Sequence, residues 1–287
     1  MLFPNGLRPM KMNLNRIAAG AALYAAILAV PASAGVIYDS IPGPVPPNVP
    51  SLGYQATQTS EFGNLIAFDG TGRDLDHVTV LMSDWALAST YGSLSPTWDY
   101  PLTLNLYNVD NSGANPEPGS LIASVTQTFA MPWRPEADPT CPGGTAYRAG
   151  DGNCYNGYAF TVSFDFAGIT VPNQLIYGLS FNTNTWGYNP VGQPGPYESL
   201  NFGLSSSAPS VGTNPFPGTA YWNTATGSSY SDGGAGGAGT FRRDTGWSPY
   251  SGAVAFDVVP EPGTYLLLSF GLLGIGLVGR HRRSARQ

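Results

Sequence analysis

Residues 158–166 read YAFTVSFDF, a segment in which large apolar side chains alternate with small or polar ones. Successive side chains of a β-strand point to opposite faces of the sheet, so the large residues of this segment all fall on one face. One face is then apolar, and the other is polar enough to contact water. The segment therefore predicts a half-buried strand of an antiparallel sheet.

The same alternation recurs along residues 35–259. It is clearest at 78–82, 102–106 and 254–258. Further strand candidates lie at 64–68, 121–129, 175–181, 200–204 and 219–222. Turn-forming Gly, Pro, Asn and Ser residues separate these segments, and no sustained helical period occurs between the two ends of the chain. The pattern predicts an all-β fold, an antiparallel β-sandwich of the jelly-roll type.

The N-terminal residues 1–34 have the pattern of a secretory signal peptide. Three basic residues precede the apolar stretch 17–30, which is short for a membrane span. Ala32 and Ala34 supply the small residues of a cleavage site, and cleavage is expected after Ala34. The chain is therefore expected to leave the cytoplasm through the general secretion machinery.

Residues 35–52 include the proline-rich run PGPVPPNVP. Because proline-rich chains are extended and semi-rigid, this segment is expected to be a lead-in to a sandwich ectodomain at 53–259. The glycine- and serine-rich stretch 225–240 is expected to be a flexible loop inside that domain. The last strand candidate ends next to Pro260, so no spacer is expected before the C-terminal tail at 260–287.

The tail contains an apolar run followed by a basic end at 280–287. Residues 263–279 carry no charge, and as a helix they reach the lower length limit for crossing a bilayer. Arg280, Arg282 and Arg283 follow at once and form a stop-transfer cluster, which the positive-inside rule places in the cytoplasm. The run predicts a single C-terminal transmembrane helix, with everything before it outside.

Pro260, Glu261 and Pro262 stand directly before this run. Proline does not fit the interior of a helix, so the two prolines hold Glu261 on an extended stretch at the outer membrane face, within reach of a protease. This order of Pro-Glu-Pro, apolar helix and arginine cluster at the C-terminus resembles the PEP-CTERM sorting signal. The resemblance covers about a tenth of the chain.

The resemblance implies recognition by exosortase, an integral membrane cysteine protease of Gram-negative bacteria. It also implies a precursor inserted transiently in the inner membrane, delivery to the cell surface or the medium, and a link to exopolysaccharide and biofilm production. The alternative is a plain anchor that is never processed, although a bare anchor needs no Pro-Glu-Pro. Residues 115–135 are similar to segments of uncharacterised exported bacterial proteins, which implies no activity.

Charge excludes several classes of function. The segment 35–259 holds 17 acidic residues, five arginines and no lysine, so its net charge is about −12. Such a surface repels phosphate backbones, which excludes nucleic acid as a partner. Without lysine, Schiff-base and P-loop chemistry are excluded as well. An acidic surface also suits an extracellular protein that must stay soluble.

Cys141 and Cys154 are the only cysteines, and an even pair in an exported chain predicts a disulfide. Two free, buried thiols are the alternative. A zinc site is not expected, because His77 is the only histidine in 35–259. No resident metal or other cofactor is expected, and calcium is the one ion left open. The loops at 69–76 and 108–111 carry oxygen ligands for it, although their Asn and Asp residues also form turns.

Catalytic patterns are scarce. A Ser-His-Asp triad would have to use His77, which is expected on the polar face of a strand, and no G-x-S-x-G elbow occurs. No catalytic residue is therefore assigned. A glycosidase with paired carboxylates remains as a distant alternative, because acidic residues are abundant.

Tryptophans give the hint of a ligand. Trp133, Trp186 and Trp247 stand in polar surroundings rich in glycine and proline, where exposed rings would stack on sugars of a polysaccharide. The alternative is that each ring covers an end of the sandwich core. The sequence thus favours a non-enzymatic surface or matrix protein, then a carbohydrate-binding module, and last a secreted glycosidase.

Overall fold

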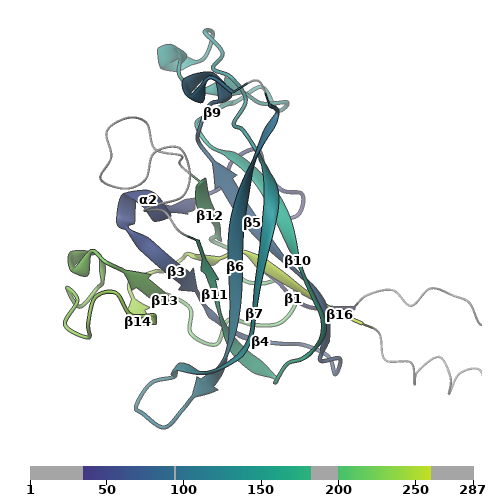
Figure 1. The fold of residues 1–287 in the computed structure, drawn as a ribbon, viewed down its shortest axis with the longest axis vertical. Helices are drawn as coiled ribbons and strands as arrows, with labels where there is room; N and C mark the ends of the chain where they lie inside the picture. Colours follow the sequence, from purple (N-terminus) through teal and green to yellow (C-terminus); the bar gives the residue numbers. More distant parts are fainter. Residues whose placement is uncertain (1–34, 94, 182–199, 260–287) are drawn as a thin grey trace, which may run out of the picture. The chain divides into compact units, whose positions relative to one another are not determined.

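The computed structural model describes residues 35–93, 95–181 and 200–259 (Figure 1). Contacts divide the chain into two units, and the described residues all fall within the unit Ala34–Val259. Nearly all of its regular structure is β-strand in antiparallel ladders, which confirms the predicted fold class at the level of a β-sandwich-like fold.

Two seven-stranded sheets form this unit. Sheet A consists of β1 (Gly35–Asp39), β2 (Ser51–Gly53), β5 (Asp74–Asp84), β10 (Tyr158–Thr170), β12 (Leu200–Ser205), β15 (Ser251–Gly252) and β16 (Val254–Val258). Sheet B consists of β3 (Thr59–Gly63), β4 (Leu65–Ala67), β6 (Thr97–Asp110), β7 (Glu117–Pro132), β11 (Gln174–Ser180), β13 (Thr219–Thr224) and β14 (Arg242–Thr245). Each predicted strand segment overlaps one of these strands, although 64–68 and 175–181 extend beyond the ends of β4 and β11.

The remaining elements are short. A two-stranded ladder joins β8 (Tyr147–Arg148) and β9 (Cys154–Tyr155). The helical turns are α2 (Tyr54–Thr57), η1 (Ala88–Tyr91), η2 (Pro142–Gly144) and η3 (Gly227–Ser229). Among the described residues, no helix is long and apolar enough to cross a membrane. The transmembrane helix expected at 263–279 lies outside the described residues.

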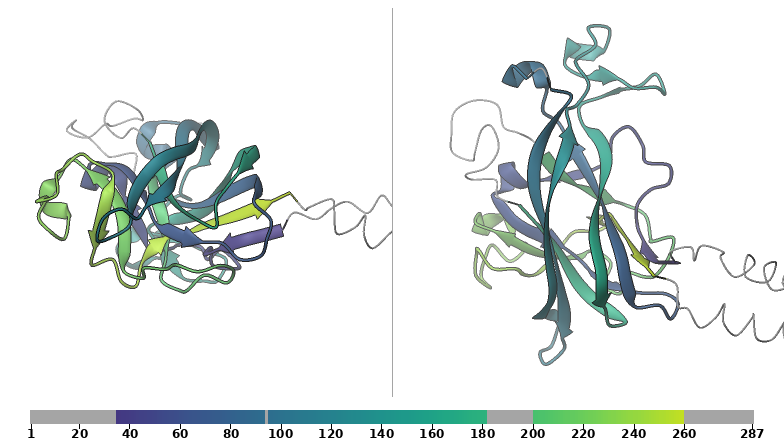
Figure 2. Two further views of the ribbon diagram at one scale, coloured as in Figure 1. Left: turned by 90° about the horizontal axis from the view of Figure 1, so that it is seen from below. Right: turned by 45° about the vertical axis from the view of Figure 1, so that its right-hand side comes forward.

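Each sheet is organised around one central strand, β5 in sheet A and β11 in sheet B. In sheet A, β10 covers one edge of β5, while β16 and β12 share the other edge end to end. In sheet B, β6 covers one edge of β11, while β4 and β3 share the other. The β6–β7 hairpin lies beside β10 (Figure 2), where the Phe129 and Phe164 rings meet edge to face. The apolar faces of both sheets enclose one core.

Residues 158–166 lie in β10, which confirms the half-buried strand predicted for them. Val162, Phe164 and Phe166 are buried in this core, whereas Tyr158 and Phe160 at the start of β10 are only half-buried. The inward face of β10 therefore continues past the end of the sandwich core.

A buried polar node lies where β3 gives way to β4. The Asn64 side chain donates from Nδ2 to the Thr219 carbonyl (2.8 Å), and its Oδ1 accepts from the Gly252 amide (2.8 Å). The Tyr177 hydroxyl donates to the Gly252 carbonyl (2.9 Å). Because Gly252 belongs to sheet A, and Tyr177 and Thr219 to sheet B, these bonds join the two sheets.

The segment 35–52 is more than a lead-in. Its first residues form β1, which pairs with β16 in a ladder that joins Gly35 to Val258. Its last residues enter β2, which pairs with β12. The expected domain start at residue 53 is therefore too late. The proline-rich sequence hid this, because strand propensity is absent from 42–50 but present on both sides of it.

The glycine-rich stretch expected as a flexible loop is tied down. The Arg242 guanidinium lies 3.9 Å from the centre of the Tyr230 ring and makes two bonds to the Asp232 carboxylate. Its Nε donates to the Gly237 carbonyl (2.9 Å). The Arg242 guanidinium therefore contacts three residues of this loop.

We predict that Asn64→Ala lowers the free energy of unfolding by about 3–5 kcal/mol, because it leaves a buried amide and a buried carbonyl without partners. Urea denaturation measures this change. Asn173→Ala is the control, because Asn173 is exposed and its side chain accepts a bond from the half-buried Arg73. The node is not essential if both variants lose less than about 1 kcal/mol.

Candidate functional site

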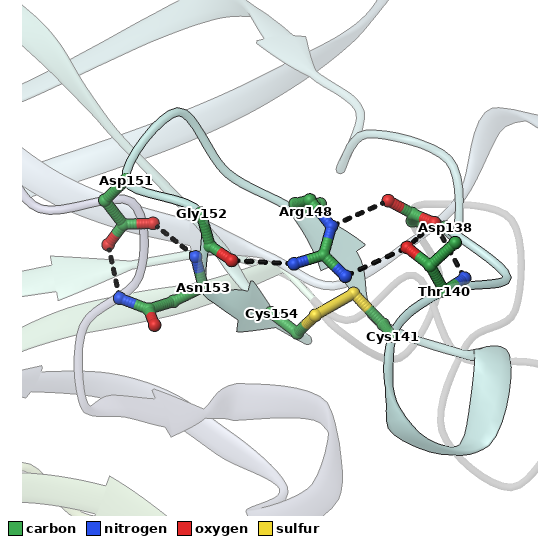
Figure 3. Close-up of a disulfide and its surroundings, with 8 residues drawn as sticks. All are labelled: Asp138, Thr140, Cys141, Arg148, Asp151, Gly152, Asn153 and Cys154. Carbon is green, nitrogen blue, oxygen red and sulfur yellow. Dashed lines mark hydrogen bonds and ion pairs between the residues drawn. A yellow bond between two sulfur atoms is a disulfide. The ribbon is translucent and has the colours of Figure 1, made fainter.

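A disulfide-bonded lobe, residues 133–157, stands at one end of the long strands (Figure 1). Cys141 and Cys154 are bonded to each other with a Cα–Cα distance of 5.8 Å, which confirms the predicted disulfide (Figure 3). The β8–β9 ladder lies at the end of the closed loop and pairs Arg148 with Cys154. The sequence forms no larger element here because turn-forming glycines and Asp residues interrupt it.

Arg148 reinforces the same closure (Figure 3). Its guanidinium donates to Asp138 Oδ2 (3.1 Å), Thr140 Oγ1 (2.9 Å) and the Gly152 carbonyl (2.7 Å). These contacts bridge the turn before Cys141 and the turn before Cys154. The disulfide and the arginine therefore connect the same two segments of the lobe. The bonds to Thr140 and Arg148 lower the pKa of Asp138.

The proline-rich segment lies against this lobe. The Tyr147 hydroxyl donates to the Pro47 carbonyl (2.7 Å), and the Ala159 amide donates to the same oxygen (3.1 Å). A surface hollow of about 670 Å³ lies between Val45–Pro47 and the rings of Tyr147, Tyr158 and Phe160. The chain's own prolines thus cover part of this aromatic surface, which fixes the start of β10.

The structure separates the predicted sugar-stacking residues. Trp133 is 7% exposed and stacks on Trp98, with ring centres 5.5 Å apart. Trp247 is half-buried against Phe62, and its indole nitrogen donates to Asp244 (2.9 Å). Trp186 lies outside the described residues. Trp133 therefore presents no open ring, because the core behind the disulfide lobe encloses it.

Sequence reasoning missed Trp85, which is 42% exposed. It directly follows β5, where Asp84 Oδ1 accepts from the Ala86 amide (2.9 Å) and Oδ2 accepts from the Trp98 indole (3.3 Å). This turn buries Ala86 and leaves Trp85 on the surface. The only available signal was an aspartate at the end of an alternating strand, which is typical of an Asx turn.

Two carboxyl groups, those of Asp84 and Glu61, have pKa values raised by burial, and they lie at the end of β5 and in β3. Burial raises the pKa of Asp84 to about 7, opposed by bonds from the Ala86 amide and the Trp98 indole. Burial also raises the pKa of Glu61, whose Oε1 accepts from Asn105 Nδ2 (2.8 Å) and from the Tyr107 hydroxyl (2.9 Å). Neither carboxyl contributes to the pKa shift of the other. The two do not form the facing pair that a glycosidase needs.

In each stretch considered for calcium, one carboxylate bonds a nearby backbone amide. Asp69 Oδ1 accepts from the Gly70 amide (2.8 Å), and Asp110 Oδ1 accepts from the Ser112 amide (2.8 Å). Within the described part of the chain, no group of three or more His, Cys, Asp or Glu side chains could hold a metal ion. Calcium binding stays a prediction. His77 is exposed on β5, with Nε2 3.6 Å from Asp76 Oδ1.

The two ends of the described domain meet in sheet A. Gly35, the first residue after the expected signal cleavage, pairs with Val258, and the Val259 amide donates to the Asp74 carbonyl (2.9 Å). Ala32, Ala34, the Pro260–Pro262 motif and the arginine cluster lie outside the described residues. Both processing sites are nevertheless adjacent in sequence to one pair of neighbouring strands.

Comparison with known families identifies the tail. Residues 258–283 match the PEP-CTERM protein-sorting motif. The chain therefore carries a signal of an exported protein that is sorted through the membrane to the cell surface, and the motif implies processing by exosortase, a membrane protease. No curated protein and no solved structure matches the chain.

We predict that replacing both cysteines, Cys141→Ser with Cys154→Ser, lowers the free energy of unfolding by about 3 kcal/mol, the cost expected for opening a loop of this length. Thermal unfolding with and without reductant measures the effect. The wild-type melting temperature should fall with reductant, whereas that of the double variant should not change. Two unmodified thiols in the mass of native, unreduced protein would contradict the bond.

We predict that Asp84 makes the domain less stable as pH rises from about 4 to about 7. The unfolded chain releases this proton near the ordinary pKa of about 3.9, whereas the folded domain keeps it until about pH 7. Folding is therefore favoured below this window and loses that advantage across it. Asp84→Asn keeps an oxygen for the Ala86 amide but cannot ionise, so its stability should fall less between pH 4 and pH 7.

The control for this experiment is Asp110→Asn. Bonds from Ser112 lower the pKa of the exposed Asp110, so its titration lies below the window. Melting temperatures across the pH series should therefore fall alike in the wild type and in Asp110→Asn. Equal slopes in the wild type and in Asp84→Asn would show that another group causes the decline.

Proposed function

We propose that the chain is a non-enzymatic surface or extracellular-matrix protein of a Gram-negative bacterium, acting in its exopolysaccharide or biofilm. The observation that carries this proposal is the PEP-CTERM motif at 258–283. The signal-peptide pattern at 1–34 supports it, because the two signals describe successive steps of one export route.

Several features of the domain support an extracellular location. The lobe is closed by a disulfide, a bond that persists in oxidising compartments. The segment 35–259 is acidic and free of lysine, which favours solubility. Among the described residues, the buried carboxyls Glu61 and Asp84 have raised pKa values and neither contributes to the shift of the other, which supports a role without the paired carboxylates of a glycosidase.

The fold also suits release by proteolysis. β16 lies between β1 and β5, and Val259, the last described residue and the one directly before Pro260, still bonds this sheet through its amide. A cut at or beyond the motif would leave every described strand in place. The product would keep its fold, because the cut would remove none of the described strands.

Carbohydrate binding is the second candidate function. The observation that favours it is the exposed indole of Trp85 beside the disulfide lobe, together with the half-buried rings of Tyr158 and Phe160. Aromatic rings with one open face bind the apolar faces of sugars. A binding role of this kind agrees with a place in a polysaccharide matrix.

We predict that changing Pro260, Glu261 and Pro262 together to alanine keeps the protein in the membrane fraction. The apolar run would remain, but the protease would lose the residues it recognises. Fractionation of cells that carry exosortase, followed by immunoblotting, measures membrane-bound and released protein. The wild type should be found at the surface or in the medium.

The chain offers a matched control in its second Pro-Glu-Pro-Gly, at 116–119. This copy begins β7, where the Glu117 carboxylate accepts from the Arg243 amide (3.0 Å). Glu117→Ala should leave sorting intact. Normal release of the alanine variant at 260–262 would refute processing at the motif, and an intact C-terminus on the mature wild type would do the same.

A further inference from the structure

Trp85 forms one wall of a surface cavity between the end of β5 and the disulfide lobe. The cavity has a volume of about 390 Å³, within the range of small-ligand sites. Leu87, Arg134, Thr145 and Asn156 contribute other parts of its wall. None of these residues was singled out by the sequence, because four separate segments bring them together.

The Trp85 ring is held in position. Its indole nitrogen donates to Ser83 Oγ (3.1 Å), so one edge of the ring is fixed. A side chain at Gly157 would collide with the same nitrogen, so this glycine lets the chain approach the ring closely. A large aromatic face that is both exposed and immobilised loses little conformational entropy when a ligand covers it.

Arg134 lines the same cavity and holds a buried donor that is not satisfied among the described residues. The residue is only 6% exposed, and its backbone is fixed by an amide bond to the Ala86 carbonyl (3.0 Å). Its Nη1 makes a long bond to the Asn156 carbonyl (3.4 Å), and among the described residues its Nε has no hydrogen-bond partner. A buried donor without a partner normally indicates a water or a ligand group.

Charge limits the chemistry of that ligand. The domain carries about −12 overall, and both Glu136 and Asp84 act on Arg134 electrostatically. The guanidinium is thus balanced locally, so it can donate hydrogen bonds without adding a net positive field. A polyanion would meet repulsion, whereas an uncharged ligand would not. Hydroxyl groups around an apolar ring face match this combination of donors and indole.

We propose that the cavity of Trp85, Arg134, Thr145 and Asn156 is a binding site for an uncharged saccharide unit of a polysaccharide. The indole stacks on the sugar face, and the guanidinium, the Thr145 hydroxyl and the Asn156 side chain bond its hydroxyls. The inference rests on the carbohydrate-binding candidate above and locates it at a site other than Trp133 and Trp247.

Isothermal titration with cellohexaose, maltohexaose, a galactomannan and the polyanion alginate tests the proposal on the secreted, disulfide-bonded protein. At least one uncharged glycan should bind at millimolar concentration or below, and alginate should not. Trp85→Ala should weaken that binding about tenfold or more, whereas Trp85→Phe should keep most of it. The Trp85 indole N–H signal in NMR should shift on titration.

Tyr250→Ala is the matched control, because Tyr250 is similarly exposed (39%) but lines a different hollow. Its affinity should equal that of the wild type. The proposal is overturned if none of the uncharged glycans binds, if only alginate binds, or if Trp85→Ala binds as tightly as the wild type. Failure here leaves the sorting experiment untouched, since that experiment reads the C-terminal motif and not this cavity.

Discussion

The Asn64 side chain is the contact on which the rest of the architecture depends. It lies at the break between β3 and β4, and its two ends bond a strand of each sheet. Gly252 must be a glycine there, because a Cβ would lie 2.6 Å from the Tyr177 hydroxyl. A buried polar group is costly unless it is satisfied, so this node favours one alignment of the two sheets over any slipped alternative.

Sequence alternation predicted the strands that are buried on one face, since period two is a local property. It could not predict β1 and β2, whose pairing with β16 and β12 is set by partners about 150 to 220 residues away. The jelly-roll subtype, which the sequence also predicts, stays a prediction. The strand order depends on which edges meet, and that information is not carried by any one segment.

The candidate site was less predictable than the fold. The cysteine pair was readable because export and even number left few alternatives. The tryptophans were ranked by their neighbours in sequence, and this failed for Trp133, whose ring stacks on Trp98 from a distant strand. Exposure of Trp85 follows from the Asp84 turn, which depends on a bond to Trp98. Local composition describes the sequence neighbours of a tryptophan, whereas the exposure of its ring depends on tertiary packing.

The sequence Pro-Glu-Pro-Gly occurs twice, and the two copies differ in their relation to the folded domain. In the copy at 116–119, the Pro116 carbonyl accepts from the Tyr221 hydroxyl (3.0 Å), and Glu117 pairs with Asp110 in the β6–β7 ladder. A protease that needs an extended, accessible backbone cannot use it. The copy at 260–263 begins immediately after Val259, the last of the described residues, whose amide bonds sheet A. The β1–β16 ladder therefore ends next to the position in the sequence where the sorting motif begins.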